Sequence, residues 1–220
     1  MVTEGFLFII VGSLTILFQV IDSFTVYNGL IDSGYSMLAA MSLKGVYDRG
    51  QPLVQLGMVV GISLSMSSLP LLRNHAVESK WSLWVKEAST MVKLTILLSS
   101  AATIGLIAVM PWMNLTLFKD QHGTQTLQVM VVSVFLMSLI YCLHTLVQSR
   151  EAKDYTIIYL AFGLIFKATL NKIAVHHLGI MGSSIMTVLS LLLILICMLV
   201  QMNKEVVKTV YKDHFGLQVG

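Results

Sequence analysis

Hydrophobic residues fill this chain in six long stretches separated by short polar segments. The stretches cover about residues 5–30, 47–72, 90–113, 124–147, 155–175 and 180–202. A hydrocarbon core about 30 Å thick needs roughly 20 helical residues to cross it, and each stretch meets that length. The pattern predicts an all-α polytopic membrane protein, with a six-span bundle over residues 1–203 and a cytoplasmic tail over residues 204–220.

The distribution of charge supports helices over a membrane barrel. No Lys, Arg, Asp or Glu lies between Asp120 and Arg150, or between Lys172 and Lys204. Barrel strands would be about ten residues long with alternating polarity, whereas these runs are long and uniformly apolar. Helices satisfy their own backbone hydrogen bonds in lipid, so six helices are the expected solution.

Composition narrows the function classes. The chain is 56% hydrophobic and 11% charged, against about 25% charged residues in soluble domains. The net charge of +3 is spread among loops, which gives no indication of nucleic-acid binding. Cys142 and Cys197 lie inside apolar stretches, where cysteine behaves as a small hydrophobic residue. Neither a disulfide framework nor a metal site is expected, and no cofactor or enzyme signature is found.

Lys and Arg residues predict the orientation, because they accumulate on the cytoplasmic side of a membrane protein. If the six spans alternate in direction, one side collects nine of these residues and the other four. The first set is Arg73, Lys80, Lys86, Lys93, Arg150, Lys153, Lys204, Lys208 and Lys212. The second set is Lys44, Arg49, Lys119 and Lys172, with Lys167 left inside a helix. Both chain ends are therefore expected in the cytoplasm.

Two polar segments on the cytoplasmic side have the composition of short interfacial helices. Residues 78–93 place Trp81 and Trp84 among charged residues, and residues 203–215 have a similar mixture. Aromatic and charged side chains together favour the membrane surface. The amino terminus has no basic start and no cleavage site, so we do not expect a signal peptide.

Polar residues in the first stretch are candidates for function. Thr15, Gln19, Asp22 and Ser23 share one face at helical spacing. An ionisable group within a membrane span is costly and commonly faces a bundle interior or a cavity. The stripe predicts either a hydrogen-bonded seam between helices or a cavity lining, in which Asp22 is a candidate cation or proton site.

The fifth stretch has a second polar face. Tyr159, Gly163, Lys167 and Asn171 follow one another at four-residue intervals. Lys167 and Asn171 are candidates for a cavity or for ion coupling. The alternative is that the long Lys167 side chain extends to the membrane surface and carries no function.

The second stretch contains a row of small residues, Gly57, Gly61 and Ser65. Small side chains allow helices to approach closely in a membrane. We therefore predict that this row packs against another helix.

Arg49 opens the second stretch beside Gly50 and Pro52. A guanidinium group binds phosphate or diphosphate through paired hydrogen bonds. Asp48 and Gln51 flank it and complete the candidate substrate-binding set. An ordinary interfacial anchor explains Arg49 equally well at this stage.

Several of these residues belong to patches that resemble a known family. The run from Gly45 to Gly57, followed by Ser68-Leu69-Pro70, is similar to the eighth span of polysaccharide and lipid II flippases of the MOP (MATE-like) exporter superfamily. Lys167 with Asn171, and then residues 177–187, resemble the passage between the eleventh and twelfth spans of that family. The similarity is greatest to the branch that includes the stage V sporulation protein B type.

The resemblance implies a fold and a function. Members of the family have about fourteen spans in two six-span lobes around a central cavity, and the six stretches here match the second lobe. By the resemblance, Arg49 engages the diphosphate of a lipid-linked sugar, and Asp48 matches the acidic residue before it. The expected partners are lipid II or another lipid-linked oligosaccharide, membrane lipids and the missing first lobe. The expected location is the bacterial cytoplasmic membrane.

The sequence also departs from the family. The first lobe and the last two spans have no counterpart, and a Gln-Gly pair after the tenth span reads Gln148-Ser149 here. We therefore expect a fragment of a longer flippase for undecaprenyl-linked polysaccharide or peptidoglycan precursors. The alternatives are a multidrug and toxin extruder of the same superfamily and a half-transporter that acts only as an interaction protein.

Overall fold

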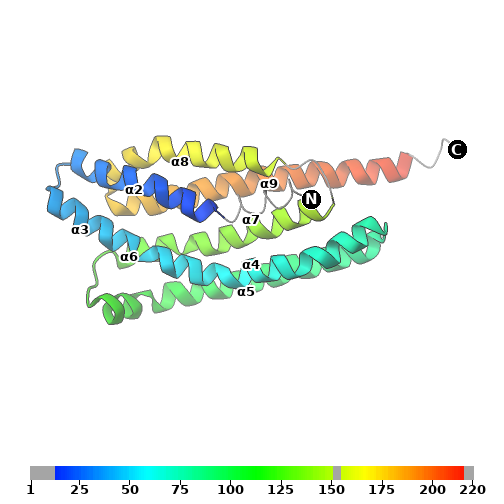
Figure 1. The fold of residues 1–220 in the computed structure, drawn as a ribbon, viewed down its shortest axis with the longest axis horizontal. Helices are drawn as coiled ribbons and strands as arrows, with labels where there is room; N and C mark the ends of the chain where they lie inside the picture. Colours follow the sequence, from blue (N-terminus) through cyan, green and yellow to red (C-terminus); the bar gives the residue numbers. More distant parts are fainter. Residues whose placement is uncertain (1–12, 151–154, 216–220) are drawn as a thin grey trace.

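The computed structural model describes residues 13–150 and 155–215 of the chain, and the side chains as far as residue 202. Within these residues the fold is entirely helical (Figure 1). The helices are α2 (Leu14–Asp32), α3 (Met37–Asp48), α4 (Gly50–Val77), α5 (Trp81–Phe118), α6 (Thr124–Met130), α7 (Val132–Ser149), α8 (Thr156–Leu178) and α9 (Ile180–Phe215). The predicted fold class is confirmed.

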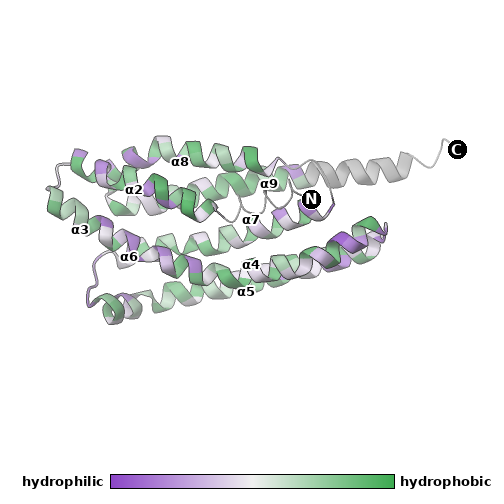
Figure 2. Cartoon of the chain, in the orientation of Figure 1, coloured by the Kyte–Doolittle hydropathy of each residue, from purple (hydrophilic) through white to green (hydrophobic). Residues whose placement is uncertain are grey.

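Six segments in the described part of the chain are long and apolar enough to cross a membrane. Four are formed by α2, α5, α8 and the first part of α9. The other two are broken helices, because α3 and α4 form one segment and α6 and α7 form another. Hydrophobic residues cover most of the helical surface, and hydrophilic residues concentrate near the helix ends (Figure 2). Each predicted stretch thus corresponds to one segment. The first eight residues of the first stretch, 5–12, lie outside the described part.

The prediction of an interfacial helix over residues 78–93 is wrong. Trp81 instead begins α5, which runs without interruption to Phe118. The Trp84 ring nitrogen donates a hydrogen bond to Ser149 Oγ at 3.1 Å, and the Arg150 guanidinium lies about 5 Å from both tryptophan rings. These contacts hold the first turns of α5 against the end of α7, so the segment continues the span instead of turning along the membrane surface.

Two predicted boundaries also move. The third span was expected to end at Met113, just after Pro111 and Trp112, yet α5 continues through Pro111 to Phe118. A proline removes one backbone hydrogen bond, and α5 accommodates that loss. Residues 203–215 were expected to have the character of a short interfacial helix, whereas they continue α9 beyond the sixth span as one helix.

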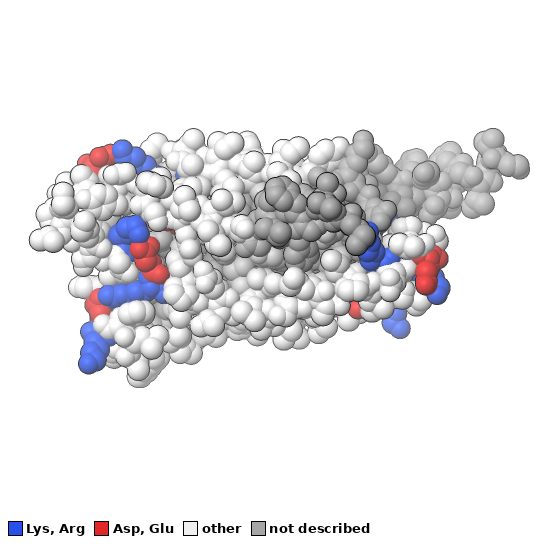
Figure 3. All heavy atoms as spheres, viewed as in Figure 1, with Lys and Arg blue, Asp and Glu red and all other residues white. Residues whose placement is uncertain are grey.

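The segments run back and forth between the two ends of the bundle (Figure 1). α7 lies at the centre of the bundle and is the most buried segment. One side of it is formed by α2, α8 and α9, and the other by α4 and α5. On the face shown in Figure 3, charged side chains of the described residues gather at the two ends. This distribution is expected if lipid surrounds the middle of the bundle.

Small residues set how closely the helices approach, as predicted for the second stretch. A Cβ atom added to Gly57 would lie 2.9 Å from Val134 on α7, closer than side chains tolerate. Ser65 is fully buried on the same face of α4. On the other side of the bundle, a Cβ atom at Gly29 would lie 2.8 Å from Val175. Glycine therefore lets α2 and α8 pack closely, which brings their polar faces together.

Candidate functional site

Asp22 on α2 and Lys167 on α8 form a buried ion pair. The Lys167 ammonium donates a hydrogen bond to Asp22 Oδ2 at 2.7 Å, and the side chains are 0% and 3% exposed. A second hydrogen bond from Lys167 reaches Thr187 Oγ1 on α9 at 2.9 Å. The Phe18 ring lies 4.6 Å from the ammonium, where its π face attracts a cation. Three helices thus meet at one positive charge.

The Asp22 carboxylate accepts three further hydrogen bonds. The donors are Tyr47 Oη at 2.8 Å, Ser183 Oγ at 2.8 Å and Asn171 Nδ2 at 3.0 Å. Asn171 also donates to Thr25 Oγ1, at 2.6 Å. Within the described residues, Asn171 Oδ1 is buried without a hydrogen-bond donor. We call Asp22, Tyr47, Lys167, Asn171, Ser183 and Thr187 the buried network.

The buried network lies at mid-depth in the bundle. Lys167 is eleven positions from each end of α8, which is about 16 Å along the helix axis and close to half of a hydrocarbon core. A charge at this depth needs a partner, because isolated charges in lipid are strongly unfavourable. Lys167 turns inward to that partner, so the alternative of a side chain extending to the membrane surface is wrong.

The sequence identified part of this network. Asp22, Lys167 and Asn171 were candidates because charged and amide groups stand out within apolar stretches. Tyr47, Ser183 and Thr187 were not among the candidates. Ser183 and Thr187 are four positions apart and so share a helix face, a signal that could have marked them. Nothing in the sequence pairs Tyr47 with Asp22.

Gln19 and Gln51 connect α2 to α4 one turn away from the buried network. Gln19 Nε2 donates to Gln51 Oε1 at 3.0 Å, and both residues are half-buried. Gln19 thus lies in a seam between helices, as one interpretation of the polar stripe predicted. Ser23, by contrast, is exposed and does not continue that seam.

Arg49 occupies the junction between α3 and α4 at one end of the bundle. Its Nη1 atom donates to Asp120 Oδ2 at 3.0 Å and to Asn114 Oδ1 at 3.3 Å. The guanidinium also lies 4.8 Å from the centre of the Phe118 ring. Its side chain is 21% exposed. Arg49 is therefore held in one orientation and still reaches solvent.

The structure does not bring Asp48 and Gln51 to Arg49. Asp48 is exposed and pairs with Lys44 one turn earlier on α3 at 2.5 Å. Gln51 faces α2 and contacts Gln19. The partners of Arg49 come instead from the end of α5 and the loop after it. Sequence reasoning missed Asp120 because it lies 71 positions from Arg49.

The Asp120 carboxylate accepts hydrogen bonds at both of its oxygen atoms. The backbone N–H of His122 donates to Asp120 Oδ1 at 2.9 Å, and Arg49 donates to the other oxygen. Both interactions favour the charged carboxylate, and they lower the pKa of Asp120 from its usual value. Asp120 is therefore a carboxylate at neutral pH and neutralises part of the Arg49 charge. No group of three His, Cys, Asp or Glu residues with the geometry of a metal site occurs in the described part of the chain.

Fold and site together define a multi-pass α-helical membrane protein with a charged network buried between its helices. The chain is 33% identical over 183 residues to an uncharacterized membrane protein, YabM, of Bacillus subtilis (strain 168). The alignment covers 83% of this chain and 34% of YabM. The chain thus spans about a third of the length of the curated relative it matches. No protein-family profile matches the sequence, and no solved structure matches it significantly.

Proposed function

We propose that this chain forms one six-span unit of a flippase that moves undecaprenyl-linked polysaccharide or peptidoglycan precursors across the bacterial cytoplasmic membrane. The proposal extends the resemblance to the MOP exporter superfamily. Alternating access needs two units that move against each other, so the unit would act with a further six-span lobe. Its substrate would be a lipid-linked oligosaccharide, and the chemistry would be binding and release without a covalent step.

The geometry of Arg49 is the observation that carries the proposal. Both hydrogen bonds of its guanidinium use Nη1. Its Nε and Nη2 atoms donate to no group in the described part of the chain, and these two atoms can bind a phosphate side-on as a pair. Phe118 and Asp120 hold the plane of the guanidinium in place. A positioned arginine with one free edge is well suited to a diphosphate.

The buried network favours a flippase over a multidrug extruder. An extruder for cationic drugs would use a carboxylate that is free to meet its substrate. The carboxylate of Asp22 is already neutralised by Lys167 and enclosed by three other donors. The network instead joins α2, α3, α8 and α9, and we propose that it keeps this side of the unit together while the substrate moves.

Binding of a lipid diphosphate tests the role of Arg49. The purified chain in lipid nanodiscs would be titrated with undecaprenyl diphosphate, and bound lipid would be measured by native mass spectrometry. We expect Arg49→Ala to weaken binding about tenfold or more, because a charge-assisted bidentate contact is lost. Arg49→Lys should retain part of the affinity, since it keeps the charge without the planar fork.

Lys172→Ala provides the matched control. Lys172 is a cation at the same end of the bundle, where it pairs with Asp32 and is 50% exposed. Its removal should leave the affinity unchanged. If Arg49→Ala binds undecaprenyl diphosphate as well as the original chain, Arg49 is an interfacial anchor and the proposal is wrong. Binding without flipping in proteoliposomes would instead favour the interaction-protein alternative.

We also propose that the end of the bundle at Ser79 faces the cytoplasm, with both chain ends, and that the end at Ser33 faces outside. The excess of Lys and Arg at the first end supports this orientation. Cysteines would be introduced at the two serines after Cys142 and Cys197 are replaced by Ala. An impermeant thiol reagent should label Ser33→Cys in intact cells and Ser79→Cys only after lysis. Equal labelling in intact cells would contradict the orientation.

A further inference from the structure

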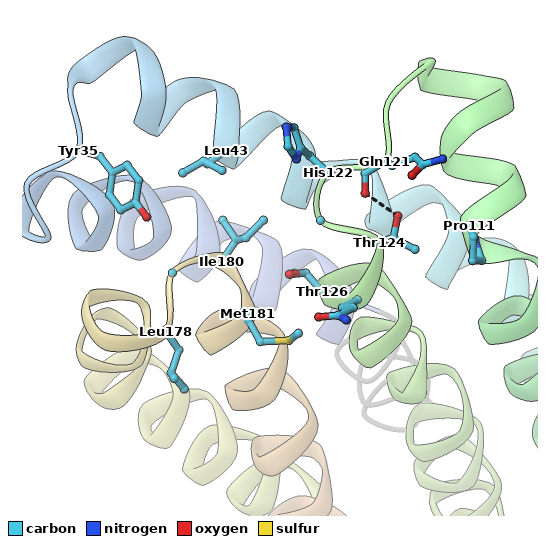
Figure 4. Close-up of a pocket in the computed structure, with 13 residues that line it drawn as sticks. Tyr35, Leu43, Pro111, Gln121, His122, Thr124, Thr126, Leu178, Ile180 and Met181 are labelled. Atoms are coloured by element: carbon cyan, nitrogen blue, oxygen red, sulfur yellow. Dashed lines mark hydrogen bonds between the residues drawn. The ribbon is translucent and has the colours of Figure 1, made fainter.

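A cavity opens at the same end of the bundle as Arg49. Its volume is about 710 Å³, within the roughly 300–1,000 Å³ of small-molecule sites. The walls come from α3, the end of α5, the loop before α6 with the first turn of α6, and the junction of α8 and α9 (Figure 4). Leu43 and Tyr35 line one wall, and Thr124 and Pro111 line the opposite one. The cavity thus lies between segments that are far apart in the sequence.

The polar side chains of the lining are mostly amides and hydroxyls, with the His122 imidazole beside them. None of its residues is Lys, Arg, Asp or Glu. Gln121 and Gln125 supply amide groups, and Thr124 and Thr126 supply hydroxyls. Amides and hydroxyls both donate and accept hydrogen bonds, and the lining offers a charged ligand no carboxylate, ammonium or guanidinium group. The site therefore matches a neutral ligand with many hydroxyl or amide groups.

Apolar surface in the cavity supports the same ligand class. Leu178, Ile180 and Met181 give the cavity apolar side chains from the junction of α8 and α9, and Tyr35 adds an aromatic ring (Figure 4). A sugar ring has polar edges and apolar C–H faces, so it can use both kinds of wall. A purely apolar acyl chain would leave the amides and hydroxyls without partners, which is costly.

Asn114 connects the cavity directly to Arg49. Its Oδ1 atom accepts the hydrogen bond from Arg49, and its Nδ2 atom donates to Thr124 Oγ1 at 3.0 Å and to the His122 carbonyl oxygen at 3.0 Å. Thr124 and His122 both line the cavity. One buried amide side chain thus separates the guanidinium from the cavity wall.

We propose that this cavity binds a neutral sugar unit, held next to a diphosphate at Arg49. The proposal rests on the proposed function, because it places the two parts of one lipid-linked sugar at neighbouring positions. The diphosphate meets the free edge of Arg49, and the sugar attached to it enters the uncharged cavity. Asn114 fixes the spacing between the two sites.

A comparison of two lipids distinguishes binding at the sugar site from binding at the diphosphate site. Undecaprenyl diphosphate with and without one N-acetylhexosamine would be titrated onto the chain in nanodiscs. We expect the sugar-bearing lipid to bind about tenfold more tightly. The double variant Gln121→Ala/Gln125→Ala should lower its affinity to that of the bare lipid, and the affinity of the bare lipid should not change. Arg49→Ala should weaken the binding of both lipids.

Asn28→Ala is the control for loss of an amide. Asn28 is exposed on α2 outside the cavity, and within the described residues its side chain donates only to the Phe24 carbonyl oxygen of its own helix. This variant should bind both lipids like the original chain. Equal affinity of the original chain for the two lipids would overturn the sugar site and leave the proposed function intact.

A soluble sugar tests the cavity even if neither lipid binds through Arg49. Saturation-transfer NMR would be recorded with an N-acetylhexosamine disaccharide and the chain in nanodiscs. We expect a transfer signal for the original chain and for Arg49→Ala, and loss of the signal for Gln121→Ala/Gln125→Ala. Absence of any signal, or an unchanged signal in the double variant, would overturn the proposal.

Discussion

Two Asp–Lys ion pairs join the same two helices, α2 and α8, in very different surroundings. The Asp22–Lys167 pair has a separation of 2.7 Å and side chains that are 3% and 0% exposed. The Asp32–Lys172 pair has a separation of 2.6 Å, but each side chain is 50% exposed. The two acidic residues are ten positions apart on α2, about 15 Å along its axis.

The two pairs have similar separations, so burial, and not distance, is expected to determine how strongly each pair affects stability. In an exposed pair each charge gives up contacts with water to form the pair, so the net contribution to stability is small. A buried pair has lost its water, so each charge depends on its protein partners. The hydrogen bonds from Tyr47, Asn171 and Ser183 to Asp22 are consistent with that dependence. The Arg49–Asp120 pair, with side chains 21% and 29% exposed, lies between these extremes.

The largest effect is expected for the buried pair. Lys167→Met leaves the Asp22 carboxylate without its cation, and Asp22→Asn leaves the Lys167 ammonium without its anion. Each change should reduce the free energy of unfolding by about 3–5 kcal/mol, as for other broken buried pairs. Thermal unfolding in detergent, followed by circular dichroism, measures the loss.

The double variant Asp22→Asn/Lys167→Met sharpens this test. It removes both charges together, so no unpaired charge stays in the bundle, and its loss should be smaller than the sum of the two single losses. Additive losses would show that the two charges do not depend on each other. That result would contradict the view that burial makes each charge of the pair depend on the other.

A smaller effect is expected for the Arg49–Asp120 pair. Asp120→Asn should lower the melting temperature only slightly, and 0.5 M salt should reduce the difference, because exposed charges are screened. The pKa of Asp120 is lowered in the folded chain, chiefly by the His122 N–H and next by Arg49. The stabilisation is therefore complete above the usual aspartate pKa of about 3.9 and is lost as the pH falls through the lowered value.

Acidification provides the corresponding measurement. The melting temperatures of the original chain and of Asp120→Asn should differ by a constant amount between about pH 5 and 8. They should converge at lower pH, where Asp120 becomes protonated. A difference that grows on acidification would contradict the assigned cause of the pKa shift.

The smallest effect is expected for the exposed pair, which serves as the matched control. Asp32→Asn and Lys172→Met repeat the two substitutions of the buried pair on the same helices. Both should leave the melting temperature nearly unchanged, because each side chain is half exposed to solvent. Losses as large as those at Asp22 and Lys167 would show that the packing of α2 on α8, and not burial of charge, controls stability.

The number and approximate position of the six spans were predictable from the sequence. Transfer of a stretch into lipid depends on the sum of its own side chains, so the information is local. The same reasoning predicted close packing at Gly57 and Gly61, since small residues at helical spacing favour it. Helix ends were less predictable. α5 begins at Trp81 because Trp84 and Arg150 hold its first turns against α7, a contact between distant segments.

Hydropathy alone marks Asp22, Lys167 and Asn171 as polar side chains that are costly in a membrane and need partners. Which groups these side chains bind follows from how the helices pack. Lys167 and Asp22 are 145 positions apart, and their meeting depends on the close approach of α2 and α8 at Gly29. Arg49 likewise has Asn114 and Asp120 as partners because the end of α5 and the loop after it lie beside the junction of α3 and α4. Hydropathy specifies which residues enter the membrane, whereas helix packing selects their partners, because side-chain contacts depend on distances that no local pattern encodes.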